Sequence, residues 1–194
     1  MVHPFIVQEE LKARGVFLFT PQDFARIFRL LPPRAKYFLE TYTKKGLFER
    51  LKKGLYAIKG ALPREEVIAN ALCRPSYISF EYALAKYGIL PEMPYVVTSA
   101  TTKTTCKFTI RGREFSYIKI KKEAFTGYLP SKEDDHTIFI AEPEKALVDY
   151  LYFVSLGKVL KNDRMRVGNL NKEKVIHYAQ LFRRPGLLKL VADL

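Results

Sequence analysis

The stretch from Phe19 to Lys59 reads FTPQDFARIFRLLPPRAKYFLETYTKKGLFERLKKGLYAIK, and its order of residues predicts two helices followed by a hairpin. Thr20 can cap the first helix and Pro21 suits the first helical position. Asp23 stands where the acid of a capping box belongs. The pair of prolines at Pro32 predicts the start of the second helix, because proline is favoured in a first helical turn.

The second helix is expected to end at Gly46, since glycine readily takes the left-handed conformation that closes a helix. Its apolar face is predicted from helical spacing: Ala35, Phe38, Leu39 and Tyr42. The opposite face is polar: Arg34, Lys36, Tyr37, Glu40, Thr41 and Lys44. The runs 47–50 and 55–58 then read as two short strands, with a loop at 51–54 that carries two lysines.

A helix, a turn, a basic helix and a basic hairpin follow one another in a winged helix-turn-helix, where the second helix enters the major groove and the hairpin contacts the DNA backbone. Residues 1–60 carry twelve Lys or Arg against five Asp or Glu. An ordinary helical hairpin with a solvated charged face is the plainer alternative, but the bases gather on one helix face and at one hairpin tip. The predicted DNA-binding residues are Arg34, Lys36, Tyr37, Thr41, Lys44, Lys45, Arg50, Lys52 and Lys53.

The composition agrees with a polyanionic partner. The chain has 194 residues and a formal net charge of +13, and Lys and Arg side chains neutralise phosphates and release counterions. No apolar run of about 18 residues and no leader-like N-terminus occur, so we expect a cytoplasmic protein without a membrane partner. Cys73 and Cys106 are too few and too far apart for a disulfide framework or a metal knuckle, and no cofactor is expected.

The run Gly60–Arg64 reads as a hinge, which divides the chain into a DNA-binding domain at 1–62 and a second domain at 63–194. The second domain is expected to be α+β. Its predicted helices lie at 65–73, after Ser79 through Tyr87, at 143–153, at about 171–182 and after 185. Its predicted strands lie at 95–99, 107–110, 114–120 and 137–140, and an extended pair of residues is expected before Ser79. Ser79 is expected to cap its helix, and the polar run 131–136 is expected to be a loop.

One acidic cluster raises the alternative of a metal-dependent nuclease, because paired acids beside a lysine are typical of such enzymes. Its members are Glu142, Glu144, Lys145 and Asp149, with Asp134, Asp135 and His136 nearby. The structural interpretation is favoured. Carboxylates stabilise the first turn of a helix, and Lys145 and Asp149 are four residues apart and can pair on the surface. Neutralising Glu142 and Asp149 is therefore expected to leave activity nearly unchanged, and neither a metal site nor an enzyme is predicted.

A second alternative is an RNA-binding surface in the C-terminal domain, with aromatic rings as a stacking platform. The candidate rings are Tyr77, Phe80, Tyr82, Tyr87 and Tyr117, and the candidate cations are Arg111, Arg113, Lys119, Lys121 and Lys122. Large aromatic side chains more often fill cores, so most of these rings are expected to be buried.

Three runs resemble the AbiEi-type antitoxins, which are transcriptional regulators of type IV (abortive-infection) toxin–antitoxin systems. These runs are LFERLKKGLYA at 47–57, YISFEYALAKYGI at 77–89 and IAEPEKALVDYL at 140–151, and the likeness covers about residues 15 to 155. The resemblance implies a winged-helix domain that binds operator DNA and represses its own operon. It also implies a second domain that counteracts a nucleotidyltransferase-type toxin without forming a stable complex with it.

Overall fold

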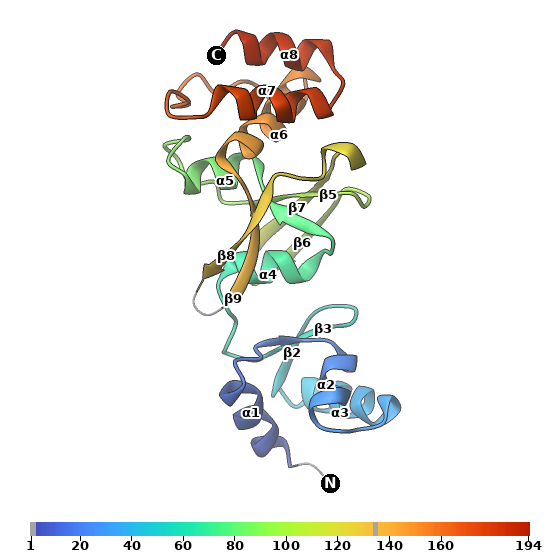
Figure 1. Ribbon diagram of the computed structural model, residues 1–194. Coiled ribbons are helices and arrows are strands. Elements are labelled where there is room, and N and C mark those ends of the chain that lie inside the picture. Colours follow the sequence, from blue (N-terminus) through green and yellow to red (C-terminus); the bar gives the residue numbers. More distant parts are fainter. Residues whose placement is uncertain (1–2, 134–135) are drawn as a thin grey trace. The chain divides into compact units, whose positions relative to one another are not determined.

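The computed structural model describes residues 3–133 and 136–194, which form two compact units, Met1–Leu72 and Cys73–Leu194. The class is mixed α+β, as predicted, with helices and antiparallel strand pairs in both units (Figure 1). The division follows the helix that begins at Glu65, whereas the sequence placed a boundary before it, between Leu62 and Pro63. The boundary between Leu62 and Pro63 therefore stays a prediction of where the DNA-binding domain ends.

The N-terminal unit alternates short helices with a small sheet. Its elements are α1 (Pro4–Ala13), β1 (Leu18–Phe19), α2 (Pro21–Ile27), α3 (Pro32–Lys44), β2 (Phe48–Lys52), β3 (Leu55–Ile58) and α4 (Glu65–Leu72). The three strands lie in the order β1-β3-β2 and both pairings are antiparallel. The short apolar run before Thr20 thus contributes a strand that pairs with the hairpin.

Local signals set the ends of α2 and α3. Thr20 and Asp23 form a reciprocal capping box at the start of α2, because the Asp23 N–H donates to Thr20 Oγ1 over 3.1 Å and the Thr20 N–H donates to Asp23 Oδ2 over 3.0 Å. Gly46 follows α3 with φ of +79°, a left-handed conformation that favours glycine. Both predictions are confirmed.

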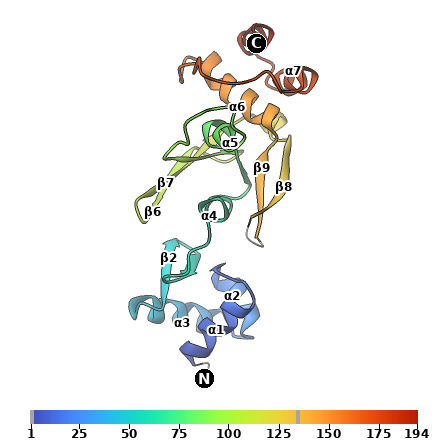
Figure 2. The ribbon, with the colours of Figure 1, turned by 90° about the vertical axis from the view of Figure 1, so that its left-hand side faces the viewer.

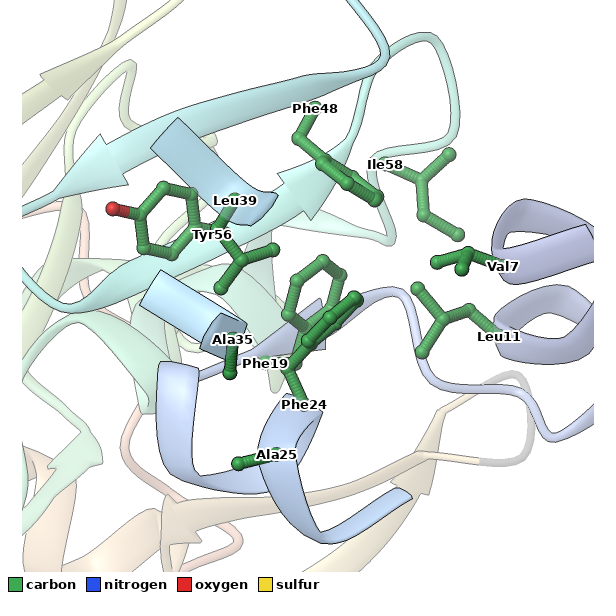
Figure 3. Packing of buried hydrophobic residues seen from close by; sticks show 10 residues of the cluster. All are labelled: Val7, Leu11, Phe19, Phe24, Ala25, Ala35, Leu39, Phe48, Tyr56 and Ile58. Carbon is green, nitrogen blue, oxygen red and sulfur yellow. The ribbon is translucent and has the colours of Figure 1, made fainter. Parts of the chain in front are cut away.

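The core of this unit is aromatic and is centred on Phe24 (Figure 3). The ring centroid of Phe24 lies 5.8 Å from that of Phe19 and 5.4 Å from that of Phe38. The same buried cluster takes in Val7 and Leu11 of α1, Ala35 and Leu39 of α3, and Phe48, Tyr56 and Ile58 of the hairpin. α3 is therefore held on its apolar face by α1, α2 and the sheet, and its other face is left outward.

The hairpin loop is shorter than the sequence suggested. β2 continues through Lys52, which pairs with Leu55, so only Lys53 and Gly54 form the turn. Leu51 and Leu55 are buried, which explains why the strand continues past Arg50. An irregularity in the register between Arg50 and Lys52 accompanies this extension.

The C-terminal unit is built on a mixed six-stranded sheet with the order β6-β7-β5-β4-β9-β8. Its elements are β4 (Ser76–Ile78), α5 (Phe80–Lys86), β5 (Val97–Thr101), β6 (Cys106–Ile110), β7 (Arg113–Lys119), a 3-10 turn η1 (Lys122–Ala124), β8 (Tyr128–Glu133), β9 (His136–Ala141), α6 (Pro143–Ser155), α7 (Lys172–Leu181) and α8 (Pro185–Ala192). α6 packs against α5, α7 and α8 at one end of the sheet (Figures 1 and 2). None of the helices in residues 3–133 and 136–194 has the length and apolar character needed to cross a membrane.

The polar loop predicted at 131–136 is wrong in the part that the structure describes. Residues up to Glu133 belong to β8, and β9 already begins at His136, so the two strands form an antiparallel hairpin (Figure 2). Leu129 pairs with Ile140 and Lys132 with Thr137. The residues of β8 have a weak strand preference, but pairing with the apolar strand β9 overrides it. The polarity of the run itself does not reveal this pairing.

Candidate nucleic-acid interface

The outward face of α3 carries a row of polar side chains one helical turn apart. Arg34, Tyr37, Thr41 and Lys44 are separated by three, four and three residues, a spacing that aligns side chains along one side of a helix. Three of them are exposed, and Thr41 is half-buried. The row spans about 15 Å at 1.5 Å per residue, which is close to the roughly 12 Å width of the major groove of DNA.

Tyr37 stands out in this row because its side chain is 72% exposed. An exposed tyrosine ring among basic residues offers both a flat apolar surface and a hydroxyl group, which are useful for contacts with bases or with sugar and phosphate. Ala35 and Leu39 on the other side of the helix are completely buried. The backbone that carries Tyr37 is therefore fixed by the core.

Most of the cations on this face are not neutralised by nearby acids. Arg34, Lys44 and Lys53 have no acidic partner within residues 3–133 and 136–194. Lys36 has Glu40 at 4.0 Å, and both side chains are largely exposed, so this pair is weak. The Lys45 ammonium lies 5.2 Å from the centre of the Tyr42 ring. These cations are therefore available to an external anion.

The hairpin adds a second basic element to the same unit, and β2 packs directly against α3. Lys53 is exposed in the two-residue turn, next to Gly54 with φ of +80°. The Arg50 guanidinium donates through Nε to the Lys52 carbonyl over 3.3 Å, which orients the arginine along the strand. All nine residues predicted as DNA-binding thus belong to α3, its C-terminal end or the β2–β3 hairpin, although Lys52 lies in a strand and not in the loop.

One exposed residue of this surface was missed by the sequence reasoning. Leu31, the residue before α3, is 67% exposed although it is apolar. Helical spacing gave no signal of this exposure, because Leu31 stands four residues before Ala35 and seven before Phe38 and so continues the apolar pattern of α3. Pro32 and Pro33, which follow it, are exposed as well.

The acidic cluster of the C-terminal unit is arranged differently from the prediction. Lys145 and Asp149 do pair at a spacing of four residues, but both side chains are completely buried, so the expected surface pair is wrong. The Asp149 carboxylate also accepts hydrogen bonds from Tyr77 Oη over 3.0 Å and from Ser79 Oγ over 2.7 Å. Ser79 precedes α5 as expected, but its hydroxyl group makes this bond and does not cap the helix.

Glu142 and Glu144 lie at the start of α6, as predicted. Glu142 contacts α7, and Glu144 contacts the residue that precedes α7. Tyr178 Oη donates to Glu142 Oε2 over 2.7 Å, and this hydrogen bond holds the pKa of Glu142 below its usual range. The Asn171 N–H donates to Glu144 Oε1 over 3.1 Å. These contacts give both acids a structural role, which is to attach the C-terminal helices to α6.

The nuclease alternative requires a metal site, and the described part of the chain offers none. Residues 3–133 and 136–194 hold no group of three or more His, Cys, Asp or Glu side chains that could bind a metal ion. Asp134 and Asp135, which the nuclease alternative also invoked, lie outside the described residues.

Four of the five rings that the RNA-binding alternative needs for stacking are buried in the core: Tyr77, Phe80, Tyr82 and Tyr117. Only Tyr87 is partly exposed, and its hydroxyl group donates to the Ala141 carbonyl over 2.8 Å. The preference for a core role is confirmed for these four residues.

Comparison with known proteins adds no relative: no protein-family model and no curated protein matches the chain.

Proposed function

We propose that the N-terminal unit is a winged helix that binds double-stranded operator DNA, with α3 in the major groove and the β2–β3 hairpin on the neighbouring backbone. The order of elements supports this proposal. A capped α2 leads through a short turn into α3, and the hairpin follows and pairs with β1. The AbiEi-like runs support the further proposal that the protein is an antitoxin, which represses its own operon and counteracts a nucleotidyltransferase-type toxin.

The observation that carries the DNA-binding proposal is the outward face of α3. A highly exposed Tyr37 lies there in a row with Arg34 and Lys44, two cations that lack acidic partners in the described part of the chain. Unneutralised cations in a row are expected to release counterions from a phosphate backbone when they bind it. Lys53 at the hairpin tip extends the same charge to a second element.

The test is the salt dependence of binding to duplex DNA, measured by fluorescence anisotropy between 50 and 200 mM salt. The parent protein is expected to give a steep negative slope of log K against log salt, at about 0.9 unit per phosphate contact. The variant Arg34→Ala/Lys44→Ala/Lys53→Ala should lose about two to three units of slope. A slope near zero for the parent would show that the basic face does not bind DNA.

A matched control removes three exposed lysines from the C-terminal unit: Lys103, Lys161 and Lys189. This variant has the same change in net charge as the α3 and hairpin variant. If both variants lose the same slope, the attraction is a general effect of net charge and the assignment to α3 is wrong.

A further inference from the structure

We infer that the tip that precedes and opens α3, formed by Leu31, Pro32 and Pro33, packs against the 5-methyl group of a thymine in the operator. This inference rests on the proposed DNA-binding function and names the base that the apolar part of the same surface would read. The three residues form a continuous exposed apolar run. Such a run on a soluble domain indicates a contact surface and not an ordinary loop.

The two prolines remove N–H donors that the start of a helix usually offers to an anion. The first N–H groups of a helix commonly bind phosphate, but Pro32 and Pro33 occupy the first two positions of α3 and have no N–H. Two of the donors of an anion site are therefore missing, and Pro32 and Pro33 offer hydrocarbon in their place. In the major groove, the hydrocarbon group on the base edges is the thymine methyl.

The position of the tip agrees with this contact. In helix-turn-helix proteins the N-terminal residues of the second helix contact base edges. Arg34 lies three residues after Leu31, a rise of about 4.5 Å along the helix, which is comparable with the roughly 3.4 Å between successive base pairs on a strand. We therefore place the thymine next to the base pair or phosphate that Arg34 contacts.

The experiment replaces thymine with uracil, which removes only the methyl group. A duplex selected by the protein from a random pool is resynthesised with deoxyuridine at each thymine in turn, and binding is measured at fixed salt. One or two positions should weaken binding of the parent protein about three- to five-fold, as expected for the loss of one buried methyl group. The Leu31→Ala variant should bind the all-thymine duplex more weakly and should show no further loss at those positions.

Leu160→Ala serves as the matched control, because Leu160 is a highly exposed leucine of the C-terminal unit. It should keep the full sensitivity to deoxyuridine. Two results would overturn the inference while the DNA-binding function stands. In the first, binding depends steeply on salt but no thymine position is sensitive to deoxyuridine. In the second, Leu31→Ala and the parent protein lose the same affinity on replacement by deoxyuridine. Absence of salt-dependent binding would overturn the function itself. A change in sedimentation of Leu31→Ala in the absence of DNA would show that the tip contacts a second copy of the chain, which also overturns the inference.

Discussion

The Lys145 ammonium and the Asp149 carboxylate form an ion pair one turn apart on α6, and both side chains are completely buried. Tyr77 and Ser79 donate to the same carboxylate, so the pair joins α6 to β4 and to the residue that precedes α5. Burial raises the pKa of Asp149 and lowers the pKa of Lys145, and the mutual attraction opposes both shifts. Removal of one partner would leave the other as a buried charge without compensation.

We predict that Asp149→Asn destabilises the protein by about 3–5 kcal/mol, the range found when one partner of a buried ion pair is removed. The double variant Lys145→Met/Asp149→Asn should be closer to the parent than Asp149→Asn alone, because it leaves no buried charge unpaired and its amide oxygen can still accept from Tyr77 and Ser79. Unfolding in urea, followed by circular dichroism, measures both. An Asp149→Asn variant as stable as the parent would contradict the burial of this pair.

An exposed ion pair in the same unit provides the control for that experiment. Lys107 donates to Glu114 over 2.8 Å across β6 and β7, but the lysine side chain is 65% exposed. Glu114→Gln should therefore change the stability by less than about 1 kcal/mol. Comparable losses for Glu114→Gln and Asp149→Asn would show that burial does not set the cost.

The contact between Tyr178 and Glu142 predicts a pH dependence. The hydrogen bond from Tyr178 lowers the pKa of Glu142 in the folded protein. A carboxyl group with a lowered folded-state pKa stabilises the fold above its unfolded-state pKa, and this contribution is lost as the pH falls through the folded-state value. Tyr178→Phe should therefore be less stable than the parent at pH 7, and the difference should shrink at pH 3.

Urea midpoints of the parent and Tyr178→Phe at pH 7 and pH 3 measure this effect. The substitution removes only a hydroxyl group, so the ring that lies close to Gly127 is retained. A difference that is the same at both pH values would mean that the lost stability comes from packing and not from the Glu142 carboxylate.

The division between base and backbone contacts predicts two kinds of DNA-binding defect. Tyr37→Ala and Arg34→Ala should each cost about 1–3 kcal/mol more on the operator than on random duplex, because both residues lie on the face proposed to enter the groove. Lys52→Ala/Lys53→Ala should weaken binding to both duplexes alike, since backbone contacts carry no sequence information. Competition binding on the two duplexes distinguishes these patterns, and equal losses on both for every variant would contradict the division.

Short-range signals were sufficient for the ends of α2 and α3. The capping box of Thr20 and Asp23, the prolines that open α3 and the left-handed Gly46 each act within a few residues, so the local sequence determines the ends of these helices. The exposure of Arg34 and Tyr37 followed from helical spacing for the same reason. Leu31 was missed because a single exposed leucine beside an apolar pattern has no distinctive local signal.

The errors in the C-terminal unit have a common physical cause, which is pairing between distant residues. A lysine and an aspartate four residues apart look the same in sequence whether they are exposed or buried. Here Tyr77 and Ser79, about seventy residues earlier in the chain, decide the question by donating to Asp149. The polar residues of β8 likewise form a strand because β9 is beside them. Neither contact can be read from a local window.

The final prediction separates repression from protection in the full-length protein. Arg34→Ala/Lys44→Ala/Lys53→Ala changes only exposed side chains, so the cores of both units should be unaffected. A reporter fused to the protein's own promoter should lose repression in this variant. Growth on co-expression with the nucleotidyltransferase-type toxin that we propose as its counterpart should be restored as well as by the parent, because protection is assigned to the C-terminal unit. The Lys103→Ala/Lys161→Ala/Lys189→Ala variant should repress normally. If the α3 and hairpin variant folds normally yet fails to protect, the basic face takes part in antitoxicity; if the parent neither represses nor protects, the antitoxin proposal itself is wrong.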